Sequence, residues 1–262
     1  MNQFQANEPA IRHRRIRQTI CRWCHAAVPL EKLCQIAARL GYGGIDIAAP
    51  ETFPTLKKYN LAGTMTPSHT IEKGLNREEN WDECLHSIRQ SIAATSAAGF
   101  TNVICFSGNR NGMDLGEGQK NCATAIKEVI GLAEKIKITL HMELLNSKVD
   151  HPDYMADHAE WAVGLVKAVG SEHFKLLYDI YHMQIMEGDV IATIKKYHPY
   201  IGHYHTGGVP GRHEIDDSQE LNYPAIIRAI VDTGFQGWLG QEFVPVGDSE
   251  ESLLQAAKIC DV

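Results

Sequence analysis

The sequence lacks any apolar stretch of the roughly 18–20 residues that a membrane-spanning helix requires. Arg14 and Arg15 lie near the N-terminus, but no run of about 7–15 apolar residues follows them, as an export signal would need. Basic residues are also outnumbered, 25 against 32 acidic ones, which gives a formal net charge of −7. Such a chain repels nucleic acid and anionic membranes. We therefore expect a soluble, cytoplasmic protein that has a small-molecule partner and binds neither nucleic acid nor a membrane.

The sequence also gives little sign of paired cysteines, either as disulfides or as metal ligands. The seven cysteines are an odd number, and several lie inside apolar runs, as Cys105 does. Cys21 and Cys24 form one Cys-x-x-Cys, but no second pair or nearby histidine completes a zinc site. We expect reduced cysteines in the core rather than disulfides or a structural metal.

A recurring pattern is the strongest sign of organisation. Three times an amphipathic segment ends at Gly, an aromatic residue follows, and an apolar run begins, at residues 37–47, 97–104 and 232–239. Glycine is favoured after a helix because it adopts the left-handed backbone there at little cost. Each copy therefore predicts a helix that turns directly into a strand.

The rest of the chain extends this alternation to eight strands with helices between them. Alternating elements predict parallel strands with helical crossovers. No Gly-x-Gly-x-x-Gly opens the first helix, so a closed barrel fits better than a doubly wound sheet. We predict the α/β class, with an N-terminal tail at 1–15 and a single (β/α)8 TIM barrel, the catalytic domain, at 16–262. The predicted strands lie near 17–23, 44–48, 60–65, 102–107, 137–143, 174–179, 200–205 and 238–243.

Four consecutive predicted strands end in polar residues that can carry chemistry. These residues are Glu143, Asp179, His205 and Glu242. In a barrel of parallel strands the active site lies at the carboxyl ends of the strands, and neighbouring strands lie about 4.8 Å apart. We therefore expect these four side chains to converge on one point.

Three carboxylates gathered there would repel one another and resist burial. A single divalent metal ion would hold them together, with Glu143, Asp179, His205 and Glu242 as its ligands. Oxygen donors with one imidazole favour Mn²⁺ or Mg²⁺ and also accept Co²⁺ or Zn²⁺.

Such a metal could hold two adjacent oxygens of a hydroxy-carbonyl compound and stabilise the enediolate formed when the carbon between them loses a proton. Glu143 and Glu242 come from strands that are not adjacent, so they could flank the substrate. One would remove a proton and the other would return it. The sequence thus predicts that these two glutamates are catalytic.

The loops after the strands add candidates for substrate binding. His182 follows Asp179 by about one helical turn, and Arg212 lies in a glycine-rich loop after the strand at 200–205. A guanidinium can bind a carboxylate or a polarised hydroxyl in a forked geometry. His69, after the strand at 60–65, is a third candidate. We exclude His203 from the metal site, on the expectation that strand alternation points it away from His205.

At these residues the sequence resembles the xylose-isomerase-like barrel superfamily, and within it the hydroxypyruvate isomerases most closely. The resemblance is strong over residues 138–245 and extends to the N-terminal half only as a fold pattern. It implies isomerisation of hydroxypyruvate and tartronate semialdehyde without an organic cofactor, with Glu143 and Glu242 as the acid/base pair. It also implies a homodimer or homotetramer, which relatives of this type often form. The segments that carry it are 178–189, 201–203, 210–214, 221–224 and 237–238.

One position departs from that family. Where those isomerases usually carry Gln, this chain has His205, as the ketose 3-epimerases of the same superfamily do. The epimerases usually place another Glu soon after the metal-binding one, and residues 144–149 contain none. The isomerase is therefore favoured, with a ketose 3-epimerase or related sugar isomerase as the alternative. More remote alternatives are a metal-dependent endonuclease, which the negative charge argues against, and a non-catalytic sugar-binding barrel.

Overall fold

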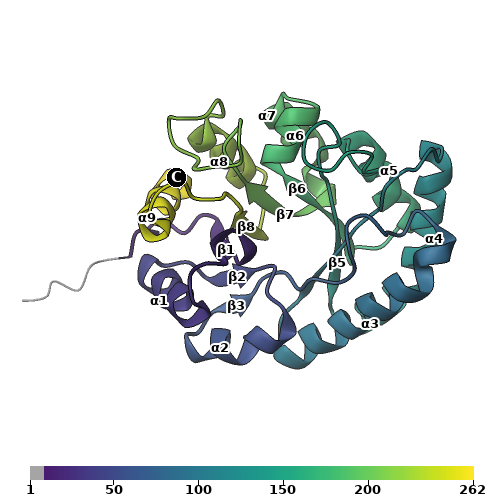
Figure 1. Ribbon diagram of the computed structural model, residues 1–262, viewed down its shortest axis with the longest axis horizontal. Helices are drawn as coiled ribbons and strands as arrows, with labels where there is room; N and C mark the ends of the chain where they lie inside the picture. The colour runs from purple at the N-terminus through teal and green to yellow at the C-terminus, as the bar shows by residue number, and fades with distance from the viewer. Residues whose placement is uncertain (1–8) are drawn as a thin grey trace, which may run out of the picture.

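A closed barrel of parallel strands organises the molecule, as the computed structural model of residues 9–262 shows (Figure 1). The eight strands lie side by side in the order β3-β2-β1-β8-β7-β6-β5-β4. The two ends of this sheet meet where Thr66, just past β3, pairs in parallel with Val103 of β4. The strands are β1 (Arg17–Cys21), β2 (Gly44–Asp46), β3 (Ala62–Gly63), β4 (Asn102–Cys105), β5 (Thr139–Glu143), β6 (Phe174–Asp179), β7 (Ile201–Thr206) and β8 (Trp238–Gln241).

Helices surround the strands and cover the outside of the barrel (Figure 1). Each presents an apolar face to the strands, and the core runs continuously from the helices into the barrel. Within residues 9–262, no helix combines the length and the apolar character needed to cross a membrane. The helices are α1 (Leu30–Leu40), α2 (Phe53–Lys58), α3 (Trp81–Ala98), α4 (Leu115–Lys135), α5 (Ala159–Val169), α6 (Ile180–Met186), α7 (Val190–Tyr197), α8 (Tyr223–Asp232) and α9 (Ser249–Cys260).

The three predicted helix-to-strand junctions are confirmed. Gly41 after α1, Gly99 after α3 and Gly234 after α8 have φ values of 93°, 78° and 80°. These are left-handed backbone conformations that a side chain would strain. Each glycine ends its helix and lets the chain enter β2, β4 or β8 within a few residues.

The eight predicted strands and the single (β/α)8 barrel are confirmed, but the boundaries shift. β3 shrinks to two residues, and β8 ends one residue before Glu242. The predicted tail also differs. Residues 1–8 lie outside the described part of the chain, whereas Ile11 is buried and its backbone N–H donates to Leu40. The body of the protein therefore begins before residue 16, because the segment that follows residue 8 packs on the end of α1.

Asp261 fastens that segment to the other end of the chain. Its carboxylate accepts backbone N–H groups of residues 12–14 at 2.6–3.0 Å. Burial alone would raise the pKa of Asp261, but these hydrogen bonds outweigh it and lower the pKa. We expect Asp261→Ala to reduce the free energy of unfolding by about 1.5–3 kcal/mol, the usual worth of hydrogen bonds to a charged group.

Urea denaturation near neutral pH tests this expectation. Because the folded-state pKa is lowered, the difference between wild type and Asp261→Ala should shrink as the pH falls through that pKa. An unchanged midpoint at neutral pH would contradict the role assigned to Asp261.

Candidate active site

Four polar side chains from the ends of consecutive strands meet at one mouth of the barrel. Glu143 ends β5, Asp179 ends β6, His205 is the last but one residue of β7, and Glu242 follows β8. One donor atom from each lies within 4.8 Å of the others, and all four side chains are buried. Asp179 and His205 are direct partners in the register of β6 and β7. The structure thus brings together the four residues predicted as metal ligands.

Burial of three carboxylates in one cluster perturbs their protonation. Burial raises the pKa of Glu143, and burial together with the charge of Glu242 raises the pKa of Asp179. Burial acts in the same direction on Glu242, but the charges of Arg212 and His205 outweigh it and hold its pKa well below its usual range. In Glu143 and Asp179 the surroundings therefore disfavour the charged form of the carboxylate. A divalent cation bound beside them would favour that charged form.

The donor atoms of this cluster suit one divalent cation. Nδ1 of His205 lies 2.9 Å from Oε2 of Glu242 and 3.4 Å from Oε1 of Glu143, yet it makes no well-directed hydrogen bond to either. A buried nitrogen without a partner, facing carboxylates, is well placed to bind a cation. With Asp179, these residues supply three oxygen donors and one imidazole, which fits Mn²⁺, Mg²⁺, Co²⁺ or Zn²⁺.

Arg212 reaches the same cluster from the loop after β7. Its Nη2 lies 2.5 Å from Oε2 of Glu242 and 3.2 Å from Oδ2 of Asp179. The guanidinium also lies over the rings of Trp23 and Tyr181, at 5.1 and 5.2 Å from their centroids. The two aromatic rings and the two carboxylates hold the guanidinium of Arg212 at the edge of the site.

His182 lies directly beside the cluster because of how α6 begins. Oδ1 of Asp179 accepts the backbone N–H of His182 and so caps the helix. The Nδ1 of His182 lies 2.7 Å from the side-chain nitrogen of Asn146 and accepts that residue's backbone N–H. The proton of a neutral ring is therefore on Nε2, which lies 3.6 Å from Oδ2 of Asp179. His182 presents this N–H to the carboxylate end of the site.

A cavity of about 280 Å³ lies against the cluster. Its polar lining consists of Glu143, Glu242, Arg212 and His151. The remainder of the wall is apolar or aromatic and is made of Trp23, Ile47, Pro67, Ile71, Ile104, Phe106 and Leu145. Both glutamates predicted to be catalytic therefore face the same small, largely apolar space.

His69 is not brought to this cluster. Its Nδ1 lies 3.0 Å from the carbonyl oxygen of Thr70 and 3.2 Å from that of Lys73. Its Nε2 accepts the backbone N–H of Phe106, and the ring is absent from the cavity wall. Both ring nitrogens of His69 are thus engaged by the backbone, and a contact between His69 and substrate stays a prediction.

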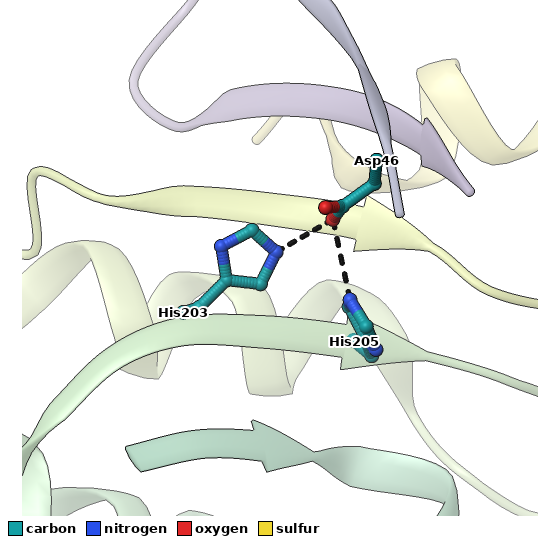
Figure 2. A group of neighbouring side chains, drawn as sticks. All are labelled: Asp46, His203 and His205. Carbon is teal, nitrogen blue, oxygen red and sulfur yellow. Dashed lines mark hydrogen bonds and ion pairs between the residues drawn. The ribbon is translucent and has the colours of Figure 1, made fainter. Parts of the chain in front are cut away.

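The prediction that His203 points away from His205 is wrong. Figure 2 shows His203 and His205 on the same side of β7, both bonded to Asp46 of β2. Residues two apart in a strand point to the same face, so the alternation rule predicts the observed arrangement rather than the opposite one. Asp46 itself was missed, because the strand predicted at 44–48 placed it in the middle of the strand, whereas in the structure it is the last residue of β2.

Two further contacts to Glu242 come from the end of β1. Trp23 donates its indole N–H to Oε1 of Glu242 at 2.6 Å, and the thiol of Cys21 lies 3.3 Å from the same oxygen. Glu242 is therefore the most tightly held carboxylate of the cluster.

All seven cysteines are free and buried, including Cys21 and Cys24, which agrees with the expectation of reduced core residues.

Comparison with known proteins gives relatives that are named as isomerases. A human protein named as a candidate hydroxypyruvate isomerase is 35% identical over 233 residues, which cover 88% of this chain and 80% of the relative. The hydroxypyruvate isomerase of Escherichia coli is 25% identical over 235 residues, covering 83% and 88%. A 2-oxo-tetronate isomerase of Cupriavidus necator is 38% identical over 108 residues, 41% of each chain.

Solved structures share the barrel. A structure described as AP endonuclease, family 2, from Brucella melitensis has a TM-score of 0.82 at 25% identity, covering 92% of this chain and 98% of that one. A D-psicose 3-epimerase in the presence of D-fructose has a TM-score of 0.73 at 17% identity, covering 94% and 95%. The IolI protein with a bound zinc atom has a TM-score of 0.74 at 15% identity, covering 93% and 95%. The last two identities are low, so these likenesses concern the fold alone.

The family described as the xylose isomerase-like TIM barrel matches residues 34–260, most of the chain. The matched region contains all four strand-end residues of the cluster, and the relatives similar in sequence are named for isomerisation of small oxo acids. This chain belongs to the xylose isomerase-like TIM barrel family and is an isomerase.

Proposed function

We propose that this chain interconverts hydroxypyruvate and tartronate semialdehyde by proton transfer through an enediolate. The observation that carries the proposal is the pair of glutamates on either side of His205. Oε1 of Glu143 and Oε2 of Glu242 lie 3.4 and 2.9 Å from the same Nδ1 atom, and both side chains line the cavity. A substrate in that cavity would have one carboxylate from β5 and another from the end of β8 within reach.

The reaction needs one proton to leave C3 of hydroxypyruvate and one to reach C2. A carboxylate removes the C3 proton, and the electron pair moves into the C2–C3 bond to form the enediolate. The other glutamate, as an acid, protonates C2, and transfer of a proton from the C3 oxygen to the C2 oxygen completes the aldehyde. Trp23 and Cys21 orient Glu242 through its Oε1.

A divalent cation held by Glu143, Asp179, His205 and Glu242 would supply charge stabilisation to the two oxygens of the enediolate. Arg212 lies at the edge of that cluster with a side chain only 14% exposed. Its guanidinium is suited to bind the carboxylate of the substrate. His182 points Nε2–H toward the same end and can hold a substrate oxygen.

The apolar wall of the cavity favours a short substrate. Ile71, Ile104 and Phe106 offer no hydrogen-bonding group to a ligand. A six-carbon ketose would press hydroxyls against this wall, and each unpaired buried hydroxyl costs about 1–3 kcal/mol. A three- or four-carbon oxo acid keeps its polar atoms near the cluster and avoids this cost.

His205 supports one alternative, a ketose 3-epimerase acting through the same metal site. That reaction also removes and returns a proton beside a carbonyl, so both glutamates would keep their roles. The substrate alone separates the two proposals. An endonuclease is disfavoured because the formal net charge of −7 gives no attraction for a nucleic acid.

Proton NMR in D₂O decides between them. Protein reconstituted with Mn²⁺, Mg²⁺, Co²⁺ or Zn²⁺ is offered hydroxypyruvate, 2-oxo-tetronate, fructose, tagatose or psicose. The reaction is then stopped, and paramagnetic metal is removed before the spectrum is recorded. We expect deuterium to enter hydroxypyruvate and tartronate semialdehyde to appear. A Glu143→Gln sample purified in the same way controls for contaminants and for spontaneous exchange.

Turnover of 2-oxo-tetronate with hydroxypyruvate unchanged would move the substrate to four carbons. Exchange at C3 of a ketose alone would overturn the proposal in favour of the epimerase. No exchange with any of the five compounds would refute both reactions for this site.

A further inference from the structure

Asp46 is a fully buried carboxylate that lies outside the four-residue cluster. Its Oδ2 lies 2.6 Å from Nε2 of His203 and 3.2 Å from Nε2 of His205. Figure 2 draws both contacts as dashed lines. Its Oδ1 accepts the backbone N–H of Ile47 at 3.1 Å. Both oxygens of a group that is costly to bury are therefore hydrogen-bonded, and the carboxylate has one fixed orientation.

The two nitrogens of His205 face two different sets of partners. Nδ1 faces Glu242 and Glu143, whereas Nε2 faces Asp46. A histidine binds a cation only through a nitrogen that carries no proton. A carboxylate beside Nε2 keeps the proton of a neutral ring on that atom and leaves Nδ1 free.

We propose that Asp46 is a positioning residue that fixes the ring and the tautomer of His205, with Nδ1 directed at the metal cluster. This inference rests on the metal site of the proposed function and adds to that site a residue from across the barrel interior. His203 completes the device, because its Nε2 donates to the same Oδ2 and keeps the carboxylate from turning.

Gly240 is what allows Asp46 and His205 to meet. In the sheet β8 lies between β1 and β7, and Gly240 is the direct partner of His205. A Cβ atom at Gly240 would lie 2.5 Å from Oδ2 of Asp46 and 2.7 Å from Cδ2 of His205. Any side chain at position 240 would occupy the space of this contact. The glycine therefore leaves room for Asp46 of β2 to reach His205 of β7.

Asp46→Asn tests the positioning role with the change of one atom. The N–H of Ile47 holds the amide oxygen at the Oδ1 position, so the amide NH₂ takes the place of Oδ2. That NH₂ would donate to Nε2 of His205 and favour the tautomer with its proton on Nδ1. We expect Co²⁺ to bind about 10- to 100-fold more weakly, the usual effect of losing an outer partner of a metal-binding histidine.

Gly240→Ala should weaken Co²⁺ binding by a similar factor while leaving every ionisable group in place. Thr206→Val is the matched control, because it also removes a buried hydrogen bond from β7, the one to Gln241 at 2.8 Å. It should lower thermal stability and leave the Co²⁺ dissociation constant unchanged. Circular dichroism checks folding, and Asp46→Asn decides the question if Gly240→Ala does not fold.

Two measurements report the result without any assay of turnover. The first is Co²⁺ titration of metal-free protein, followed by the visible absorption of the ion. The second is NMR of ¹⁵N-histidine in Zn²⁺-loaded protein, where wild type should show a proton on Nε2 of His205.

The outcomes separate this inference from the proposed function. Equal Co²⁺ affinity and an unchanged Nε2 proton in Asp46→Asn would overturn the positioning role and leave the metal site intact. If the wild-type protein binds Co²⁺ no better than Asp179→Asn does, the metal site is overturned, and the positioning role with it.

Discussion

Replacing Glu143 or Glu242 with Gln is expected to lower kcat at least about 100-fold, the usual scale for loss of a general acid or base. Both side chains line the cavity, and each lies within 3.4 Å of Nδ1 of His205. Glutamine keeps the size of the side chain but cannot accept the substrate proton. The measurement is kcat on hydroxypyruvate in metal-reconstituted protein, with Glu220→Gln, an exposed position bonded to Gln184, as control.

The two variants should differ in stability when metal-free. Glu143→Gln removes one of three clustered carboxylates and should leave the melting temperature unchanged or higher. Glu242→Gln removes the charge that pairs with Arg212 and leaves one amide oxygen in place of the two oxygens that accept from Arg212 and Trp23, so its melting temperature should fall. Both glutamates are also proposed ligands, so Co²⁺ affinity is measured beside kcat. Activity near the wild-type level in both variants would rule out the glutamate pair as the acid and base.

Removal of metal by a chelator is expected to abolish activity and to lower thermal stability. The cluster gathers the carboxylates of Glu143, Asp179 and Glu242 within 4.8 Å, and a divalent cation relieves their repulsion. A cation present at 100 times its dissociation constant stabilises the fold by about 2.7 kcal/mol. For a chain of this size that corresponds to roughly 5–10 °C in melting temperature.

Differential scanning fluorimetry and activity assays follow the same samples before chelation, after it and after return of Mn²⁺, Mg²⁺, Co²⁺ or Zn²⁺. Asp179→Asn is the matched control and should show little stabilisation by any of the four ions. Full activity in protein whose metal content has been shown to be negligible would contradict a metal-dependent mechanism.

Patterns local in the chain predicted much of this structure. A helix that ends at a glycine and leads into an apolar strand can be recognised within about ten residues, because backbone conformation and apolar periodicity act over that range. Polar residues at the ends of four consecutive strands predicted a cluster, because parallel strands end at the same side of a barrel. The prediction for His203 was wrong for a reason already present in the sequence, since residues two apart in a strand share a face.

The sequence by itself determined the alternation of strands and helices, the barrel, and the approach of Glu143, Asp179, His205 and Glu242. Only the tertiary structure decided what surrounds them. Asp46 meets His203 across 157 positions of the chain, and Gly240 opens the space for its contact with His205. No short-range pattern encodes such contacts, because they depend on barrel closure and on which side chains fill its interior.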